Sequence, residues 1–230
     1  MSDCWHDVTP GEAEGLAAYR DLILEWNRKF NLTALRDAEA IDGRLIAESL
    51  RLVPFLGNRS GLRAIDIGTG AGIPGVPLAI VRPDIDFTLV DATSKKVRFV
   101  ELVVRELELT NVTPLHARSE DLAHDPAHRE RYDLAAARAV TQLAALAELV
   151  LPFLRIGGRA LLPKGEEVSD ELARARNALQ ILGGSLESAE LLARVPCCGV
   201  TRLVILDKIE PSLVRYPRRP GIPEHDPLGG

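Results

Sequence analysis

An acidic residue followed by three alternating glycines is the feature of this chain whose spacing most directly indicates chemistry. Asp66 ends a short apolar run over residues 62–67, and Gly68, Gly70 and Gly72 follow it. An apolar run of that length predicts a buried strand. The glycines behind it let the backbone turn sharply and approach a ligand where a Cβ atom would collide. The sequence therefore predicts a loop that binds a nucleotide-type cofactor.

The spacing of these glycines separates two classes of cofactor. The dinucleotide fingerprint is G-x-G-x-x-G, whereas the third glycine here, Gly72, comes one residue earlier. An acid-x-Gly-x-Gly-x-Gly loop resembles the S-adenosyl-L-methionine (SAM) loop of Rossmann-like methyltransferases. That resemblance implies SAM as the cofactor. An NAD-dependent oxidoreductase is the weaker alternative, because no catalytic Tyr-Lys, His or Cys pair is evident in the sequence.

Two further polar positions follow predicted strands. Asp91 comes after the strand predicted at 86–90, about 20 residues beyond the glycines, where a carboxylate accepts hydrogen bonds from both ribose hydroxyls. Ser119 and Glu120 follow the strand predicted at 112–116, where this fold usually contacts the adenine ring. A helix N-cap is the alternative role at both positions. Because ligands of a parallel α/β sheet bind beyond the carboxyl ends of its strands, we expect these residues to line one site with the glycine loop.

The end of the fourth predicted strand offers no nucleophile and no general base. Residues 135–140 read Ala-Ala-Ala-Arg-Ala-Val, so Arg138 is the one charged residue there. Amino-group methyltransferases acting on adenine or cytosine carry an Asn/Asp-Pro-Pro-aromatic motif at this point, and cytosine-C5 enzymes need a cysteine. Pro196-Cys197 imitates the cysteine motif, but we interpret Cys197 and Cys198 as core or turn residues of a terminal hairpin. The strand end therefore suits a substrate atom with a free lone pair, which loses no proton when it is methylated.

The order of predicted elements indicates one α/β domain with additions at both ends. We expect a helical extension over 1–60, a methyltransferase core over 61–210, and a basic, proline-rich tail over 211–230. The predicted strands are 62–67, 86–90, 112–116, 132–137, 159–162, 186–195 and 200–209. The predicted helices are 13–30, 37–55, one from 75, 94–109, 141–154 and 167–182.

The last two predicted strands follow one another without a helix, so they should pair as an antiparallel hairpin. An α/β sheet that ends in this way resembles the Rossmann-like class I SAM-dependent methyltransferase fold. That fold has a seven-stranded, mostly parallel sheet with an antiparallel last strand.

The composition of the chain limits the classes of protein to which it can belong. A chain of 230 residues with 46% hydrophobic content supplies one core and a small accessory element. No apolar run reaches the roughly 20 residues that cross a bilayer, and the acidic start does not resemble a signal peptide, so we expect a cytoplasmic protein. The three cysteines and five histidines lack metal-site spacing, and nothing in the sequence requires more than a monomer. The net charge of −5 argues mildly against a nucleic-acid partner, although the tail concentrates three arginines over 215–219.

Six segments together resemble the 16S ribosomal RNA guanine-N7 methyltransferases, a family also known as glucose-inhibited division protein B. They are WNRKFNLT at 26–33, DIGTGAGIPG at 66–75, DATSKKVRF at 91–99, ARA at 137–139, PKG at 163–165 and YPRRPGIP at 216–223. The resemblance implies cofactor-binding roles for Gly68, Ile73, Ser119, Glu120 and Arg138. It also implies a guanine in the 530 loop of 16S rRNA as the substrate. The chain departs from the family pattern at Leu45, where a histidine is usual, and at Glu48, where an aspartate is usual.

Guanine N7 carries an in-plane lone pair, so its methylation requires positioning and no general base. Arg138 is expected to donate to guanine O6 or to hold the methionine carboxylate of SAM. A structural ion pair with Glu120 or another strand-end acid is the alternative. A looped-out guanine needs cations around its phosphates, and the candidate RNA contacts are Asn31, Arg36, Arg44, Lys164, Arg218 and Arg219. A non-catalytic RNA-binding or SAM-binding regulatory protein on the same fold is the main functional alternative.

Overall fold

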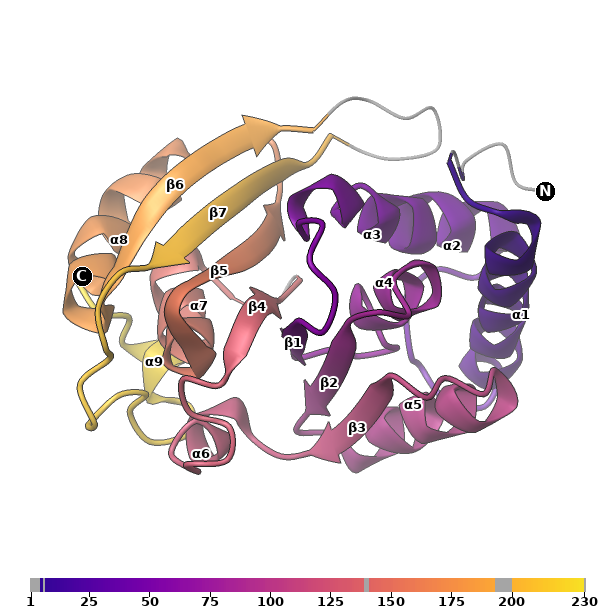
Figure 1. Ribbon diagram of the computed structural model, residues 1–230, viewed down its shortest axis with the longest axis horizontal. Helices are drawn as coiled ribbons and strands as arrows, with labels where there is room; N and C mark the ends of the chain where they lie inside the picture. Colours follow the sequence, from indigo (N-terminus) through magenta and orange to yellow (C-terminus); the bar gives the residue numbers. More distant parts are fainter. Residues whose placement is uncertain (1–4, 6, 139–140, 193–199, 230) are drawn as a thin grey trace.

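The centre of the molecule is a seven-stranded sheet in the order β3-β2-β1-β4-β5-β7-β6 (Figure 1). The structure, a computed structural model, describes residues 5, 7–138, 141–192 and 200–229. The strands are β1 (Arg63–Ile67), β2 (Asp86–Asp91), β3 (Val112–His116), β4 (Tyr132–Ala136), β5 (Leu154–Lys164), β6 (Gly184–Leu191) and β7 (Arg202–Lys208). Strands β1 to β5 pair in parallel, and β7 lies antiparallel between β5 and β6. The predicted sheet, mostly parallel with an antiparallel last strand, is confirmed.

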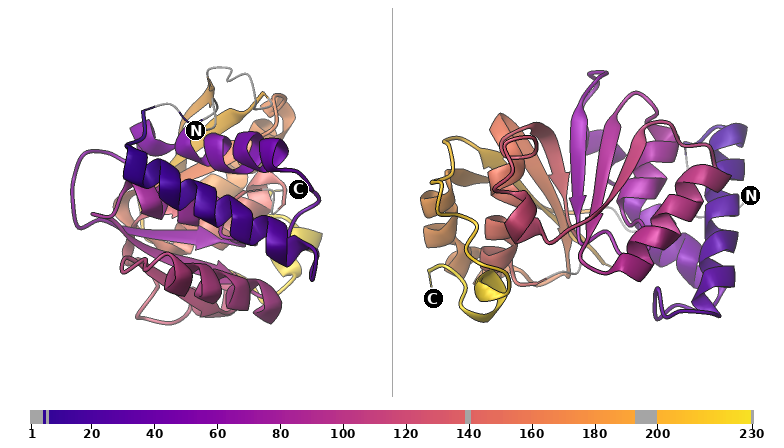
Figure 2. Two further views of the ribbon diagram at one scale, coloured as in Figure 1. Left: turned by 90° about the vertical axis from the view of Figure 1, so that its right-hand side faces the viewer. Right: turned by 90° about the horizontal axis from the view of Figure 1, so that it is seen from below.

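Helices cover both faces of this sheet (Figure 2). They are α1 (Pro10–Asn27), α4 (Gly75–Val81), α5 (Ser94–Glu106), α6 (Ser119–Leu122), α7 (Leu143–Val150), α8 (Ser169–Leu182) and α9 (Ile222–His225), with a shorter series between α1 and β1. Successive residues of β1 belong to different cores. Ala64 packs in the core that includes α1, α4 and α5, whereas Ile65 and Ile67 pack in the core that includes α7 and α8. This alternation follows from the period of two in a strand that is covered on both faces.

The first helix of the N-terminal extension packs against α4 and α5. A capping box starts α1, since Thr9 accepts from the backbone of Glu12 and the Glu12 side chain accepts from the backbone of Thr9. Its buried residues are Ala13, Leu16, Tyr19, Ile23 and Asn27. The ring of Trp26 lies 5.7 Å from the ring of Phe99 on α5. The aromatic stripe of α1 therefore packs against the core.

The second predicted helix is not one regular α-helix. In place of a helix over 37–55, the chain forms α2 (Ala38–Ile41), a π-helical segment η1 (Asp42–Ala47), α3 (Glu48–Leu50) and a 3₁₀ turn η2 (Val53–Phe55). The predicted N-cap is confirmed, because the Asp37 carboxylate accepts from the backbone of Ala40 at 2.8 Å. Gly43 lies inside the π-helical segment, where its low helix propensity weakens the regular turn. Segments of this kind often occur at functional sites.

Other boundaries differ from the prediction by a few residues. The helix predicted to reach 154 ends at Val150, followed by a 3₁₀ turn η3 (Leu151–Phe153). Pro152 in that turn has no N–H to continue an α-helix. Strand β5 starts at Leu154, five residues before the predicted 159. The predicted turn between β6 and β7, with Cys197 and Cys198, lies outside the described residues, as does Cys4.

The C-terminal segment lies against the domain. Arg129 donates to the backbone carbonyls of Ser212 and Tyr216, both at 2.8 Å. The Tyr216 side chain is buried in the core that contains α7 and α8. The short helix α9 lies beside α7 (Figure 1). The tail predicted over 211–230 is therefore packed on the core as far as the structure describes it.

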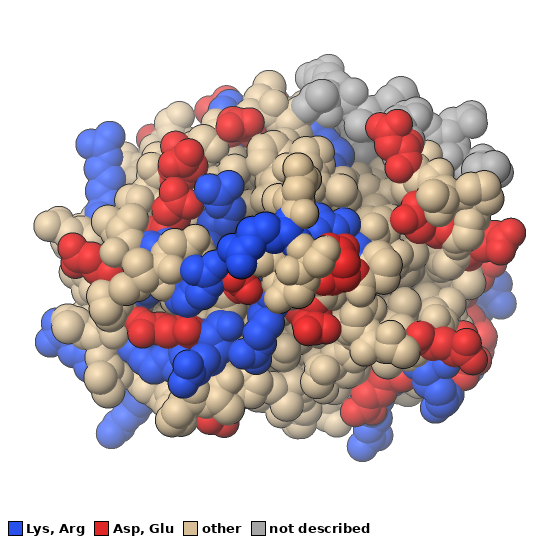
Figure 3. Space-filling model, viewed as in Figure 1, with Lys and Arg blue, Asp and Glu red and all other residues tan. Residues whose placement is uncertain are grey.

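The surface concentrates positive charge despite the net negative charge of the chain. Lys and Arg side chains form a band across the middle of the face seen in Figure 3.

At the start of β4 and β5, Arg155 pairs with Asp133 at 2.6 Å. The guanidinium of Arg63 lies over the ring of Tyr132 at 4.9 Å. Arginines here connect the starts of neighbouring strands.

Two negative findings concern the described residues. None of their helices combines the length and apolarity that crossing a membrane requires. Their His, Cys, Asp and Glu side chains form no group of three or more placed to hold a metal ion.

Candidate functional site

The carboxyl ends of β1 and β2 bring the glycine loop and Asp91 together. The backbone N–H of Gly68 donates to the carbonyl of Val90 at 2.9 Å, and that of Gly70 donates to Asp91 Oδ2 at 3.0 Å. Asp91 Oδ1 accepts from the backbone of Thr93 at 2.8 Å, and the residue is 5% exposed. Thr93, and not Asp91, is the N-cap of α5. The helix-cap alternative for Asp91 is therefore wrong, and its carboxylate instead fixes the glycine loop.

Asp66 holds the loop from inside the protein. Its Oδ2 accepts from Thr69 Oγ1 at 2.6 Å and from the backbone of Gly75 at 3.0 Å. Its Oδ1 is buried and has no hydrogen-bond partner among the described residues. Burial raises the pKa of Asp66 to about 7, although both hydrogen bonds oppose that shift. Asp66 therefore fixes Thr69 and Gly75 from the buried side of the loop.

The N-terminal extension supports the middle of the loop. The hydroxyl of Tyr19 on α1 donates to the carbonyl of Ala71 at 2.6 Å, and the Tyr19 side chain is fully buried. A Cβ atom on Gly72 would lie 2.6 Å from Val76 Cγ2 and 3.2 Å from the Tyr19 hydroxyl. Gly72 is therefore required for packing between the loop, α1 and α4.

Gly70 is the loop glycine that faces open space. Its φ of +62° lies in the left-handed region, and a Cβ atom there would have the carbonyl of Gly68 at 3.9 Å as its only near neighbour among the described atoms. Gly75 differs, because its Cβ would lie 2.2 Å from Leu89 Cδ2. The first half of the loop can thus approach a ligand, while the second half is packed against the protein.

A cavity of about 160 Å³ opens beside this loop. Its polar lining includes Gly68, Asp91, Ser119 and Glu120, and its apolar lining includes Ile67, Val90, Ala92 and Leu149. Apolar walls suit a flat purine ring, and carboxylates accept hydrogen bonds from ribose hydroxyls and ring amines. The lining of this cavity is therefore of the kind that binds a nucleoside, and Asp91 is one of its hydrogen-bond acceptors.

Ser119 and Glu120 are brought into this cavity by the turn that begins α6. Arg118, and not Ser119, is the N-cap of that helix, and no side chain caps it. The Ser119 hydroxyl donates to Glu120 Oε2 at 3.3 Å. Glu120 Oε1 accepts from the backbone of Gly221 at 2.9 Å. The capping alternative is therefore wrong for Ser119, and one oxygen of Glu120 is bound to the C-terminal segment.

Arg138, just after β4, is held by the N-terminal extension. Its Nη2 lies 2.6 Å from Glu48 Oε2 and donates to the carbonyl of Arg44 at 2.7 Å. Arg138 therefore forms a structural ion pair, as the alternative predicted, but its partner is Glu48 of α3 and not Glu120 or another strand-end acid. The charge of Arg138 opposes part of the rise in the Asp66 pKa that burial causes. The Arg138 side chain is 24% exposed.

The residues predicted to contact RNA differ in their partners within the protein and in their exposure. Arg36 donates to Asn31 Oδ1 at 2.8 Å beyond the end of α1. Lys164 Nζ lies 2.7 Å from Glu171, and its side chain is 13% exposed. Three further predicted residues differ in exposure: Arg218 pairs with Glu148, whereas Arg44 and Arg219 are exposed. Ile73, predicted to bind the cofactor, is buried in the core.

Sequence reasoning gave no site role to Tyr19, Glu148 or Glu224, and it noted Glu48 only as a departure from a family pattern. Tyr19 belongs to an apolar stripe, and nothing local marks its hydroxyl. Glu148 did carry a signal, because it is the one charged residue in the helix LAALAELV. A fully buried acid requires a partner, but the sequence does not name that partner.

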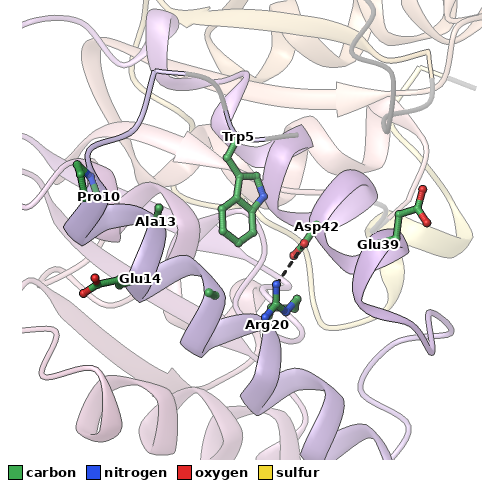
Figure 4. A pocket seen from close by; sticks show the side chains of 8 residues that line it. Trp5, Pro10, Ala13, Glu14, Arg20, Glu39 and Asp42 are labelled. Carbon is green, nitrogen blue, oxygen red and sulfur yellow. Dashed lines mark hydrogen bonds and ion pairs between the residues drawn. The ribbon is translucent and has the colours of Figure 1, made fainter. Parts of the chain in front are cut away.

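A larger cavity of about 600 Å³ lies away from the strand ends, against α1 and α2 (Figure 4). Trp5, Arg20 and Asp42 are among its lining residues, and Arg20 pairs with Asp42 at 3.3 Å. Its size alone does not make it the site, because ligands of this kind of sheet bind at the carboxyl ends of the strands. The smaller cavity has that position and the matching acceptors.

Comparison with known proteins gives relatives over almost the whole chain. The family model described as rRNA small subunit methyltransferase G matches residues 12–196. A ribosomal RNA small subunit methyltransferase G from Roseiflexus sp. (strain RS-1) is 42% identical over 217 residues, covering 94% of this chain and 92% of the relative. The protein of the same name from Chloroflexus aggregans is 45% identical over 210 residues, covering 91% of this chain and 87% of the relative.

Solved structures show the same fold at low identity. TrmN from Thermus thermophilus matches with a TM-score of 0.55 and 20% identity, covering 80% of this chain and 53% of that chain. A SAM-dependent methyltransferase from Aquifex aeolicus matches with a TM-score of 0.53 and 15% identity, covering 70% of this chain and 90% of that chain. The fold, the cavity beside the glycine loop and the near full-length relatives lead to one conclusion: this chain belongs to the rRNA small subunit methyltransferase G family, whose members are SAM-dependent enzymes.

Proposed function

We propose that this enzyme transfers a methyl group from SAM to N7 of a guanine in the 530 loop of 16S rRNA. The observation that supports this most is the combination of an adenosine-type cavity with a strand end that carries Arg138 and no nucleophile or base. When bound, SAM supplies an electrophilic methyl group on sulfonium. The proposed target atom needs no deprotonation, which suits this strand end.

Positioning by the protein is then the main contribution to rate. Guanine N7 attacks along its in-plane lone pair, so the protein must hold the two reactants in line and close together. The Arg138 guanidinium would donate to guanine O6 or to the methionine carboxylate, leaving N7 free. Glu48 and the Arg44 carbonyl restrict the rotation of that guanidinium, which pre-organises either contact.

The proposed RNA contacts divide by how their charges are used within the protein. Arg44 and Arg219 are exposed and remain the strongest candidates for phosphate contacts. Asn31 and Arg36 form a polar pair at the end of α1, beside Phe30, whose ring lies under Lys95 at 5.4 Å. Lys164 and Arg218 already have acidic partners, so we propose a supporting role for both. An rRNA substrate also implies action in the cytoplasm, and we propose that the enzyme acts there as a monomer.

The experiment that tests this function uses methyl-labelled SAM with two substrates, naked 16S rRNA and assembled small subunits. We expect label in one guanine, recovered as N7-methylguanine after hydrolysis and mapped to the 530 loop. Label in another base or at another atom would contradict the proposed target. Cofactor binding without transfer to either substrate would favour the non-catalytic binder.

A further inference from the structure

The C-terminal segment, which follows the residues 12–196 that the family model matches, reaches the cofactor cavity. The backbone N–H of Gly221 donates to Glu120 Oε1 at 2.9 Å, and Glu224 of α9 lines the same cavity as Asp91 and Ser119. The cavity therefore has walls from two distant parts of the chain. The strand ends form one wall, and the segment around α9 forms part of the other.

A buried ion pair fixes this segment to α7. Glu148 is 0% exposed, and its oxygens accept four hydrogen bonds from Arg218: one from the backbone N–H at 2.7 Å, two from Nε at 3.0 and 3.2 Å, and one from Nη2 at 2.8 Å. These hydrogen bonds raise the pKa of Arg218. A fully buried carboxylate left without its partner is strongly unfavourable. The pair therefore holds the segment in place, and the Arg218 charge is directed inward.

Further contacts hold the same segment on both sides of Arg218. His124 Nε2 lies 2.8 Å from the carbonyl of Pro217, and Arg218 Nη2 donates to the carbonyl of Asp226 at 2.6 Å. The second contact closes the segment around α9. Glu224 therefore comes from a segment with defined contacts, which favours a fixed position of its carboxylate beside the cavity.

A carboxylate beside the cavity can distinguish adenine from related bases by their hydrogen-bond donors and acceptors. Adenine presents an exocyclic amine, which donates hydrogen bonds, whereas hypoxanthine presents a carbonyl oxygen at the same position. A carboxylate accepts hydrogen bonds and repels a carbonyl oxygen. One Glu120 oxygen already accepts from Gly221, whereas Glu224 is exposed at the cavity and its side chain makes no hydrogen bond or ion pair with the described residues.

We propose that the segment 217–226 is part of the cofactor site, with the Glu148–Arg218 pair holding it against the cavity and the Glu224 carboxylate accepting from the exocyclic amine of adenine. The proposal rests on the cofactor site of the function proposed above and not on the RNA target. It gives Arg218 a positioning role in cofactor binding, in place of the RNA contact expected from the sequence.

Calorimetric titration of the full chain tests the adenine contact without any turnover. The probes are S-adenosylhomocysteine and S-inosylhomocysteine, which differ at the exocyclic group. We expect Glu224→Gln to weaken S-adenosylhomocysteine binding about tenfold and to reduce the preference for the adenosyl over the inosyl probe. Glu210→Gln, at an exposed acid before the segment, is the matched control and should change neither value. Unchanged binding and unchanged preference in Glu224→Gln would overturn the adenine contact.

A second pair of variants tests the ion pair. Arg218→Ala alone leaves the Glu148 charge buried without a partner and can destabilise the fold. The variant tested therefore combines Arg218→Ala with Glu148→Gln, which removes both charges. We expect the double variant to fold, to become sensitive to trypsin after Arg215, and to bind S-adenosylhomocysteine at least fivefold more weakly. A double variant that is cleaved after Arg215 and yet binds as tightly as the parent chain would overturn the role of the segment. Methyl transfer by the unaltered chain is measured separately, so failure of the RNA target is distinguishable from failure here.

Discussion

Arg138 Nη2 lies 2.6 Å from Glu48 Oε2, so a residue of the N-terminal extension holds the arginine that follows β4. The other Glu48 oxygen accepts from Thr201 Oγ1, just before β7, at 2.6 Å. One carboxylate therefore connects the extension, the end of β4 and the start of β7. The Glu48 side chain is 15% exposed, which strengthens its charge-assisted hydrogen bonds relative to those in water.

Glu48→Gln is expected to lower kcat/KM about tenfold, equivalent to about 1.4 kcal/mol of transition-state stabilisation. The amide still accepts from Thr201 but loses the charge that orients the Arg138 guanidinium. Glu48→Asp keeps the charge and should recover part of the loss. Steady-state methyl transfer and calorimetric SAM titration measure the effect.

Glu39→Gln on the neighbouring α2 removes an exposed acid and is the matched control. An unchanged kcat/KM in Glu48→Gln would mean that Arg138 needs no support from the extension.

Alanine substitutions at Gly75 and Gly70 are expected to affect different properties, stability in the first case and cofactor binding in the second. Gly75→Ala places a Cβ 2.2 Å from Leu89 Cδ2 and should lower the free energy of unfolding by about 1–3 kcal/mol. The Cβ of Gly70→Ala would extend into open space, so we expect only about 1–2 kcal/mol of destabilisation from the left-handed backbone conformation. The main effect of this substitution should be weaker cofactor binding. Thermal denaturation and SAM titration separate the two effects.

The control for both substitutions is Gly11→Ala in α1, where a Cβ meets nothing within 4 Å. It should stabilise the chain by up to about 1 kcal/mol through helix propensity. A Gly70→Ala protein that binds SAM normally would remove Gly70 from the cofactor site.

Asp66 is expected to give stability an unusual pH dependence. Its pKa is raised from 3.8 to about 7 in the folded chain, so between these values the folded state holds a proton that the unfolded state has lost. The contribution of Asp66 to stability is therefore greatest below its unfolded pKa, falls as the pH rises toward 7, and levels off above it. Each unit of the pKa difference corresponds to about 1.4 kcal/mol.

Thermal melting of the parent chain and Asp66→Asn between about pH 4 and pH 8 tests this dependence. The difference in Tm between the two proteins should change across that window in favour of the variant as pH rises. Asp86→Asn, at an exposed acid that starts β2, should give a constant offset. Parallel curves for Asp66→Asn would show that Asp66 titrates at its ordinary pKa.

Charge reversal at Arg219 or Arg44 is expected to weaken RNA binding without changing SAM affinity. Each phosphate contact that is lost should reduce the slope of log K against log salt by about 0.7–0.9. Filter binding of 16S rRNA fragments at several salt concentrations measures the slope. Arg174→Glu on α8, whose side chain is 67% exposed, is the matched control. A slope in Arg219→Glu equal to that of the parent chain would remove the tail from the RNA interface.

The sequence by itself determined the glycine loop, the position of Asp91 directly after a strand, the succession of strands and helices along the chain, and the antiparallel last strand. Each of these depends on residues close together in the chain: a period of two or of 3.6, a glycine that tolerates positive φ, or an acid directly after a strand. Local patterns carry this information because backbone geometry is repeated within each element. The same reasoning was less accurate for 37–55, where a π-helical segment interrupts a regular apolar spacing.

Only the tertiary structure decided which side chains meet. Asp66 has the position of a ligand residue in the sequence but supports the loop from within. Arg138 pairs with Glu48, 90 positions earlier, and Arg218 pairs with Glu148, 70 positions earlier. The physical reason is that an ion pair depends on which elements pack together and on how completely both partners leave water, and neither quantity is encoded in the spacing of residues along one helix or strand.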